Sequence, residues 1–296
     1  MKKILITGKH GALAPNLAKK LRQNYQIRFL SRNPDSENTF YWHTQKEELD
    51  LRALEGVSGI VHLAGASVAD KRWTASRKKE LTSSRVDSAK LLLNSLKQKN
   101  HKLDSFVSAS ATGYYGARTT DHIFTEDDPP SDDFLAKLCH EWEQAALAFQ
   151  AEDVASRVTI FRLGVVVDRH SGILQKLYLP AKFSLLSPLG SGEQYMPWVH
   201  IEDAARAFAW ALEKNTEGIY NLTAPQHITN KEFTNTLLET FGRKSWLPAV
   251  PSFVLKTAFG EMSQMLLEGS RVSCEKLCKA GFTFQYPLLR DALSHA

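Results

Sequence analysis

Short apolar runs alternate with longer amphipathic stretches through the first half of the chain. The runs are typical of buried strands, and the stretches repeat their apolar residues at helical spacing. Because neighbouring parallel strands need a crossover of this length, the alternation predicts βαβ units around a parallel sheet. The predicted strands are Lys3–Thr7, Ile27–Ser31, Gly59–Ala64, Ser105–Ala109 and Val158–Leu163, and the predicted helices run from about Ala14 to Asn24, Arg77 to Lys97 and Asp133 to Gln150.

The pattern changes after Gly164. Proline and glycine recur through residues 169–198, which indicates a loop-rich insertion. A helix from about Ile201 to Lys214 and a strand, Gly218–Leu222, follow, with two or three further helices predicted after them. We therefore predict two domains. Residues 1–168 form a core domain, to which residues 199–224 return. Residues 169–198 and 225–296 form a smaller cap on the substrate side.

The composition is that of an ordinary globular protein. Of 296 residues, 43% are hydrophobic and 23% are charged, so disorder is not expected. No apolar run approaches the roughly 20 residues that a membrane-spanning helix needs. The net charge of +5 is spread along the chain without the dense basic stripe of a nucleic-acid binder, and it suits an anionic small molecule such as a nucleotide.

Cysteine usage and the N-terminus indicate a cytoplasmic protein. Cys139, Cys274 and Cys278 are too few for a disulfide framework and fit a reducing compartment. The apolar run Ile4–Thr7 is too short for the core of a signal peptide. Cys274 and Cys278 lack the partner set of a zinc site, so no metal is predicted.

A glycine-containing turn lies directly between the first predicted strand and the first predicted helix. Gly8 allows a tight turn, and Gly11 allows the backbone to approach a pyrophosphate at the helix N-terminus. The alternative is an ordinary glycine turn that only ends a strand. The candidate cofactor-binding residues of this turn are Thr7, Gly8, Lys9, His10, Gly11, Ala12 and Leu13.

The end of the second predicted strand bears on which dinucleotide would bind. An NAD site places an acidic residue there for the ribose 2′-hydroxyl, and that charge would repel a 2′-phosphate. Here Ser31 and Arg32 occupy the strand end, with no acid before Asp35. A guanidinium binds phosphate through two hydrogen bonds, so NADP is favoured over NAD, although Arg32 as a solvated loop residue is the alternative.

At this point the sequence resembles a known family, the extended short-chain dehydrogenases/reductases, which include sugar-nucleotide epimerases. More narrowly it is similar to an atypical, epimerase-like branch with a C-terminal cap domain. The resemblance implies an NAD(P)-binding Rossmann fold, that is, a doubly wound parallel sheet with a smaller C-terminal α/β cap. The matching blocks run in order along almost the whole chain and include ILITGKHG, FLSRNP, IVHLAGASV, SASATGYYG, FRLGVVV and PLGSGEQYMPWVHIEDAARA.

The resemblance also implies cofactor-binding roles that spacing alone does not reveal. It assigns residues 8–13 to the pyrophosphate, and Ser31 with Arg32 to the 2′-phosphate. Relatives read Gly-Gly-Thr-Gly-Phe-Ile-Gly in the turn where this chain reads Gly-Lys-His-Gly-Ala-Leu-Ala, so Lys9 either adds charge near the phosphates or crowds the turn. The further positions are His62, Leu63, Ala64 and Gly65 on the ribose and adenine side, Glu80 and Arg85 on the following helix, and Val165 beside the nicotinamide.

The catalytic pair of ordinary members, Tyr-x-x-x-Lys, is absent. Alignment on Glu143 puts Leu135 at the tyrosine and Cys139 at the lysine, and neither side chain performs the proton transfer of that pair. Lys137 is two residues from Cys139 and faces elsewhere on a helix.

Ser110 and Tyr115 are the candidate catalytic residues that remain. Ser110 matches the substrate-side serine of the family, and Tyr114 and Tyr115 follow it as candidate acids, with a packing role as the alternative. His200 is a candidate for the pocket lining, with a helix cap or a core residue as the alternative.

Two functions follow. The first is an NADP-dependent oxidoreductase or epimerase that acts on a small molecule, for which a sugar nucleotide is one candidate, with a homodimer as one option for its assembly. The second is an NADP(H)-binding sensor or scaffold without turnover. The fold serves both functions equally. Loss of the Tyr/Lys pair favours the second function, and the retained Ser110 and the cap insertion favour the first.

Overall fold

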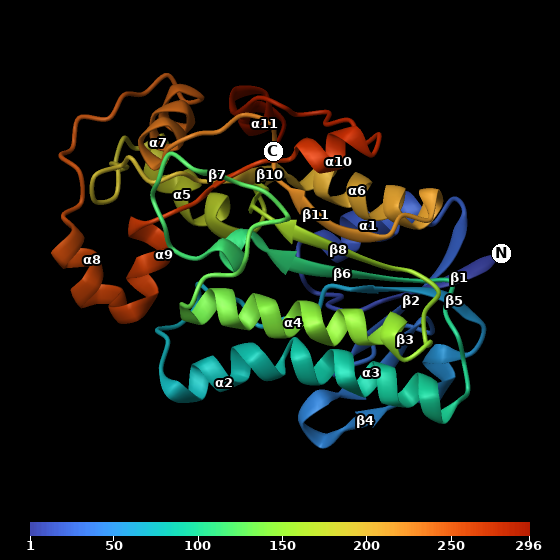
Figure 1. The fold of residues 1–296 in the computed structure, drawn as a ribbon. Helices are drawn as coiled ribbons and strands as arrows, with labels where there is room; N and C mark the ends of the chain where they lie inside the picture. The colour runs from blue at the N-terminus through green and yellow to red at the C-terminus, as the bar shows by residue number, and fades with distance from the viewer.

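The computed structural model describes residues 1–296 and is built around one eight-stranded sheet (Figure 1). The spatial order is β11-β8-β6-β5-β1-β2-β3-β4, and every neighbouring pair is parallel except β3 with β4. This confirms the predicted doubly wound parallel sheet. The strands are β1 (Lys2–Ile6), β2 (Tyr25–Ser31), β3 (Thr39–His43), β4 (Glu48–Leu49), β5 (Val57–His62), β6 (Ser105–Ala111), β8 (Val158–Leu163) and β11 (Gly218–Leu222).

The order of strands reverses beside β1. The chain adds β2 and β3 on one side of β1 and then returns to add β5, β6, β8 and β11 on the other side. In such sheets the crevice outside the carboxyl ends of the strands at the reversal is where ligands bind. The loops that follow β1 and β5 therefore form the walls of the expected ligand crevice.

Helices cover both faces of the sheet (Figure 1). On one face α1 (Leu13–Leu21) packs against α6 (Ile201–Lys214), whose alanine-rich buried side allows close contact. On the other face lie α3 (Val86–Gln98) and α4 (Phe134–Ala151), with α2 (Ala75–Ser83) preceding them. Two large apolar cores result, one beneath each pair of helices.

A smaller group of helices lies beyond the carboxyl ends of β6 and β8 (Figure 1). It consists of α5 (Gly172–Lys182), α7 (Asn230–Glu239), α8 (Ser252–Phe259) and α9 (Gln264–Leu267), with α11 (Leu289–His295) packed on α7. Two short parallel pairs connect this group to the sheet region: β9 (Val165–Val167) with β10 (Trp198–His200), and β7 (Ile123–Phe124) with β12 (Arg271–Val272). The division of the chain into core and cap at the predicted boundaries stays a prediction.

Several predicted elements need correction. The segment predicted as loop contains helix α5, because Leu174 and Ala181 pack into an apolar core, and this packing offsets the backbone hydrogen bond that Pro180 removes near the end of the helix. The helix predicted from Arg77 to Lys97 is two helices, interrupted at Ser84 and Arg85. Strand β3 was not predicted, and the C-terminal part holds five helices, α10 (Glu275–Lys279) included, rather than two or three. No helix combines the length and apolar character needed to cross a membrane.

Asp203 connects the C-terminal segment to α6. Its fully buried carboxylate accepts hydrogen bonds from the backbone N–H groups of Gln285 and Tyr286, each at 2.8 Å, and from Arg206 at 2.7 Å. The carboxylate therefore holds a segment that lies more than 80 residues away along the chain.

We predict that Asp203→Ala lowers the free energy of unfolding by about 2 kcal/mol, because two backbone donors and one guanidinium lose a charged acceptor. Urea denaturation measures this loss. The matched control is Glu202→Ala, which removes a partly exposed carboxylate paired with Lys20 and should cost less than about 1 kcal/mol. Equal losses for the two variants would contradict the anchoring role of Asp203.

Candidate functional site

The loops after β1 and β5 meet through Gly8 and Thr7. Gly8 has a φ of +73°, and a Cβ there would lie 2.7 Å from the carbonyl oxygen of Leu63. A backbone atom cannot move aside as a side chain can, so this position requires glycine. The hydroxyl oxygen of buried Thr7 accepts hydrogen bonds from the N–H groups of Leu63 and Ala64, both at 3.0 Å. These contacts fix the two loops against each other.

The imidazole of His62 is fully buried beneath these loops. Its Nδ1 lies 3.0 Å from the Thr7 hydroxyl, and its Nε2 lies 3.2 Å from the Ser88 hydroxyl. Because the Thr7 oxygen already accepts two N–H groups, its proton is donated to Nδ1, which assigns the tautomer with the proton on Nε2. Burial lowers the pKa of His62 from 6.5 to about 4, so the ring is neutral at physiological pH.

A cleft of about 440 Å³ opens at these loops. Ten of the predicted cofactor-binding residues line it: Gly8, Lys9, His10, Gly11, Ser31, Arg32, Leu63, Ala64, Gly65 and Glu80. Thr7, Ala12, Leu13 and His62 do not line the cleft, and Arg85 and Val165 line a second cavity instead. One wall of the cleft was not predicted from the sequence. It is formed by the end of β3 and the residues after it, Trp42, His43, Thr44 and Gln45. The aromatic run Thr39–His43, which is typical of a strand, is the signal that could have indicated it.

Of the two basic side chains on this side of the cleft, Lys9 is paired with an acid and Arg32 is not. Lys9 forms an ion pair with Asp35, which lowers the pKa of that carboxyl group, and it also donates to Thr39 at 2.9 Å. Arg32 is exposed and forms no ion pair. Asp35, the first acid along the chain after β2, is therefore already paired, and the Arg32 guanidinium at the end of β2 is without an acidic partner.

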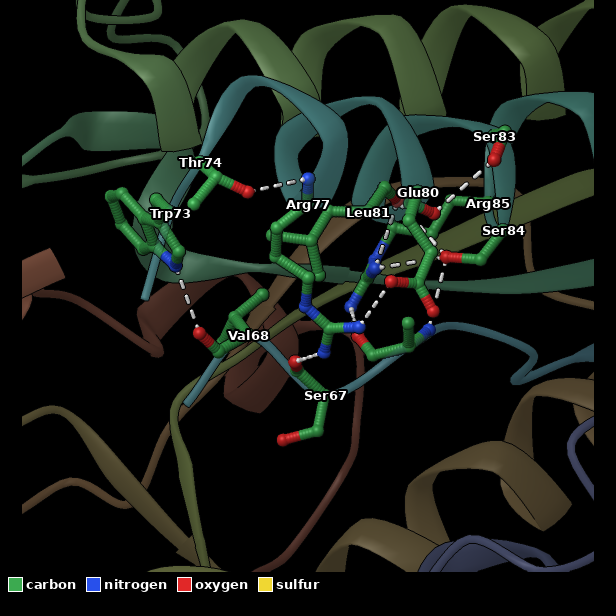
Figure 2. A network of polar contacts seen from close by, with 11 residues as sticks. Ser67, Val68, Trp73, Thr74, Arg77, Glu80, Leu81, Ser83, Ser84 and Arg85 are labelled. Atoms are coloured by element: carbon green, nitrogen blue, oxygen red, sulfur yellow. Dashed lines mark hydrogen bonds and ion pairs between the residues drawn. The ribbon is translucent and has the colours of Figure 1, made fainter. Parts of the chain in front are cut away.

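Arg85 lines the second cavity and packs against Gly65 of the cleft, and Figure 2 draws its hydrogen bonds. Its guanidinium donates to the carbonyl oxygens of Ala66 and Leu81, at 2.9 and 3.0 Å, and contacts the face of Trp142. No carboxylate pairs with it, and burial lowers its pKa to about 10. At neutral pH Arg85 is thus a buried cation without a counter-ion, which favours an anionic ligand beside it.

Helix α2 and the residues that flank it hold the loop after β5 (Figure 2). Ser84 accepts from the N–H of Ala66 at 3.0 Å, and Trp73 donates to the carbonyl oxygen of Val68 at 2.9 Å. Buried Arg77 donates to the carbonyl oxygen of Ser67 and to Glu80, the latter at 2.6 Å. The Glu80 carboxylate therefore faces the cleft already paired with a cation.

The second cavity, of about 330 Å³, lies at the carboxyl ends of β6 and β8, between α4 and the cap helices. Most of its lining is apolar. Leu135 and Cys139, the residues at the positions of the missing catalytic pair, are both part of this lining, whereas Lys137 is exposed. Burial raises the pKa of the Cys139 thiol to about 12, so the thiol is neutral.

Ser110 and Tyr115 belong to a closed buried network and not to the lining of the cavity. Ser110 donates to Glu143 at 2.7 Å, and Arg162 binds the same carboxylate through two hydrogen bonds of 2.8 Å. The Tyr115 hydroxyl accepts from Arg162 at 2.9 Å and donates to Asn221 at 2.6 Å, while burial raises its pKa. This geometry favours a structural role for both residues, and their catalytic role stays a prediction.

His200 caps α6. Its Nδ1 accepts from the N–H of Glu202 at 3.2 Å, its ring packs on Tyr286, and it does not line the cavity. The interpretation as a cap is therefore the one that the structure supports. Cys274, which precedes α10, and Cys278 within α10 have their sulfur atoms 3.9 Å apart.

Comparisons with known proteins agree with this geometry. The model of the NAD dependent epimerase/dehydratase family matches residues 4–223, and a domain of unknown function, DUF1731, matches residues 250–296. An epimerase family protein of Mycobacterium leprae is 34% identical over 99% of this chain and 95% of its own length. The crystal structure of human epimerase family protein SDR39U1 with NADPH superposes with a TM-score of 0.90 at 30% identity, covering 99% of this chain and 98% of that chain. A nucleoside-diphosphate sugar epimerase from Corynebacterium glutamicum gives a TM-score of 0.79 at 26% identity, covering 99% of this chain and 57% of that chain.

We predict that the buried imidazole makes stability depend on pH. Because the pKa of His62 is lower in the folded protein than in the unfolded chain, unfolding takes up a proton between pH 6.5 and about 4. The contribution is fully present above pH 6.5 and falls by about 3 kcal/mol as the pH drops to about 4.

The measurement is urea denaturation of the wild type and of His62→Leu across this pH range. His62→Leu should be less stable at pH 7 and should lose less stability on acidification, and His140→Leu, which removes an exposed imidazole, serves as the control. An unchanged pH slope in His62→Leu would show that His62 does not titrate as described.

Proposed function

The chain belongs to the NAD-dependent epimerase/dehydratase family, and from that premise we propose that it is an NADP(H)-binding, epimerase-like oxidoreductase of the extended short-chain dehydrogenase/reductase type. The observation that carries this proposal is the position of the cleft. It lies at the reversal of strand order, with the Gly8 loop on one side and the loop after β5 on the other, and it adjoins a cavity at Gly65 and Arg85.

The chain's own residues fit a dinucleotide pyrophosphate. The Gly8 loop has no room for a side chain, and α1 starts without a side-chain cap on its N-terminal N–H groups. Free N–H groups and the helix dipole together favour an anion at this end. The buried, unpaired guanidinium of Arg85 supplies a second positive group toward the cavity.

The 2′-phosphate of NADP has a suitable partner in Arg32. Ser31 ends β2, its hydroxyl lies 3.3 Å from His10, and Arg32 extends at the edge of the cleft without an acidic partner. Asp35, the first acid after the strand end, is paired with Lys9. The NADPH in the human relative's structure supports the same choice of cofactor.

A bound nicotinamide supplies or accepts hydride, and the cavity is where a substrate would meet it. Val165, which the family resemblance assigns to the nicotinamide side, is part of the cavity wall. Leu135 has no ionisable group, and the Cys139 thiol, with its pKa raised to about 12, stays protonated and is a poor acid, so both residues add mainly apolar surface to this wall. We expect hydride transfer on generic carbonyl substrates to be slower than in relatives with a positioned acid, by about a hundred- to ten-thousandfold.

The apolar wall also favours a second candidate, an NADP(H)-binding sensor or scaffold that does not turn over. Both candidates share the cofactor cleft, and they differ only in whether the cavity performs chemistry. A cytoplasmic location, a small-molecule substrate such as a sugar nucleotide, and a homodimeric assembly stay predictions.

We predict that the wild type binds NADPH at least about tenfold more tightly than NADH. Arg32→Ala should weaken NADPH by about tenfold and leave NADH nearly unchanged, because only the 2′-phosphate loses a partner. Fluorescence titration measures both affinities, and Arg22→Ala, which removes an exposed arginine outside the cleft, is the control. Equal losses for NADPH and NADH would show that Arg32 does not bind the 2′-phosphate.

Tyr115→Phe separates a structural from a catalytic role. Because the hydroxyl is tied to Arg162 and Asn221 within the buried network, its removal should lower the free energy of unfolding by about 1–3 kcal/mol and leave NADPH affinity unchanged. Denaturation, NADPH titration and any NADPH oxidation are measured together. Unchanged stability with complete loss of turnover would instead make Tyr115 the proton donor. The same measurements on Ser110→Ala distinguish a structural from a catalytic role of Ser110.

A further inference from the structure

We propose that the cavity beside the cofactor cleft binds a small, largely apolar molecule that carries a hydroxyl group and no nucleotide. The inference rests on the proposed function only in treating this cavity as the substrate side of the cofactor cleft. It replaces the sugar nucleotide with a different class of ligand.

The walls of the cavity are mostly apolar. Val68 comes from the loop after β5, Leu135 and Leu138 from α4, Leu163 from the end of β8, and Met265 and Leu266 from α9. Its volume of about 330 Å³ lies at the lower end of ligand pockets, which span roughly 300–1,000 Å³. A compact hydrocarbon body fits such a space, and the polar ring of a sugar would leave its hydroxyl groups without partners.

Charged groups at the cavity are too few for a nucleoside diphosphate. Arg85 and Glu268 are the charged residues of its lining, and the Glu268 carboxylate accepts a hydrogen bond from Thr119 at 2.5 Å. An adjoining cleft of about 530 Å³ shares Ala117 and Glu268 with the cavity and extends it on this side. Its lining has three carboxylates, Asp132, Asp133 and Glu268, against two cations, Arg118 and Lys256, so a diphosphate would meet net negative charge there.

Two buried polar groups of the lining have no partner, the side-chain oxygen of Gln194 and the indole N–H of Trp142. Gln194 is 2% exposed, and its amide nitrogen donates to the carbonyl oxygens of Leu189 and Leu266, at 3.0 and 2.6 Å. These two bonds fix the amide, so its Oε1 is the acceptor that remains, and no group of the chain donates to it. A ligand hydroxyl would satisfy this acceptor, which is why the proposed ligand is an alcohol and not a plain hydrocarbon.

The test uses calorimetric titration of the full chain, with and without saturating NADP⁺, and three probes: cinnamyl alcohol, trans-β-methylstyrene and UDP-glucose. We expect cinnamyl alcohol to bind at least about tenfold more tightly than UDP-glucose, and more tightly than the hydrocarbon that lacks its hydroxyl. A tighter fit of UDP-glucose would overturn the proposal, and equal affinities for the alcohol and the hydrocarbon would overturn the role of Gln194.

Leu266→Asp tests whether the alcohol occupies this cavity. The charge in the lining should weaken cinnamyl alcohol by at least about tenfold, and Leu179→Asp, at a position 62% exposed on α5, should leave its affinity unchanged. Equal affinities in wild type and Leu266→Asp would overturn the assignment. If Leu266→Asp does not fold, the comparison of the three probes on the wild type decides alone.

The NADP⁺ titration keeps this proposal distinct from the proposed function. Binding of cinnamyl alcohol without any binding of NADP⁺ would contradict the cofactor and leave the cavity assignment supported. Binding of NADP⁺ without cinnamyl alcohol would contradict the ligand class and leave the cofactor supported.

Discussion

The close approach of the Gly8 backbone to the carbonyl oxygen of Leu63 is the constraint on which the rest of the site depends. A side chain at Gly8 would lie 2.7 Å from that oxygen, so the two loops meet only if the residue is glycine. Thr7 and His62 then fix the contact from below through a buried chain of hydrogen bonds. With the two loops in contact, the N-terminus of α1 faces the crevice. The loop after β5 then reaches Arg85, whose guanidinium donates to the carbonyl oxygen of Ala66.

Two buried arginines, Arg162 and Arg85, differ in their partners, and the difference indicates different roles. Arg162 is neutralised by Glu143 through two hydrogen bonds, and every part of its network is enclosed, so it stabilises the junction of β6, β8 and β11. Arg85 is buried to a similar degree but contacts only carbonyl oxygens, a hydroxyl and an aromatic face. A buried cation without a counter-ion is costly, and a bound anion would remove that cost. The apolar cavity begins on the far side of the same guanidinium.

Local patterns in the sequence were enough for much of the fold. The strands that became β1, β2, β5, β6, β8 and β11 and the glycine turn are recognisable because each depends on a few consecutive residues. Helix α5 was missed because Pro180 suggested a loop, and β3 because its aromatic run is short. The cavity was beyond sequence reasoning, since Val68, Leu135 and Leu266 meet only in the folded chain. The same holds for Tyr115, whose hydroxyl is occupied by residues 47 and 106 positions away.

The central claim is that a cofactor cleft of NADP(H) type opens onto a largely apolar cavity in which Leu135 and Cys139 stand at the positions of the catalytic tyrosine and lysine. A crystal structure of the NADPH-bound protein tests it most directly, through the groups that face C4 of the nicotinamide. We predict that Leu135, Cys139 and their apolar neighbours face that atom, with the 2′-phosphate at Arg32. A tyrosine, lysine, histidine or carboxylate within hydrogen-bonding reach of a substrate at C4, or a nicotinamide bound away from this cavity, would contradict the account.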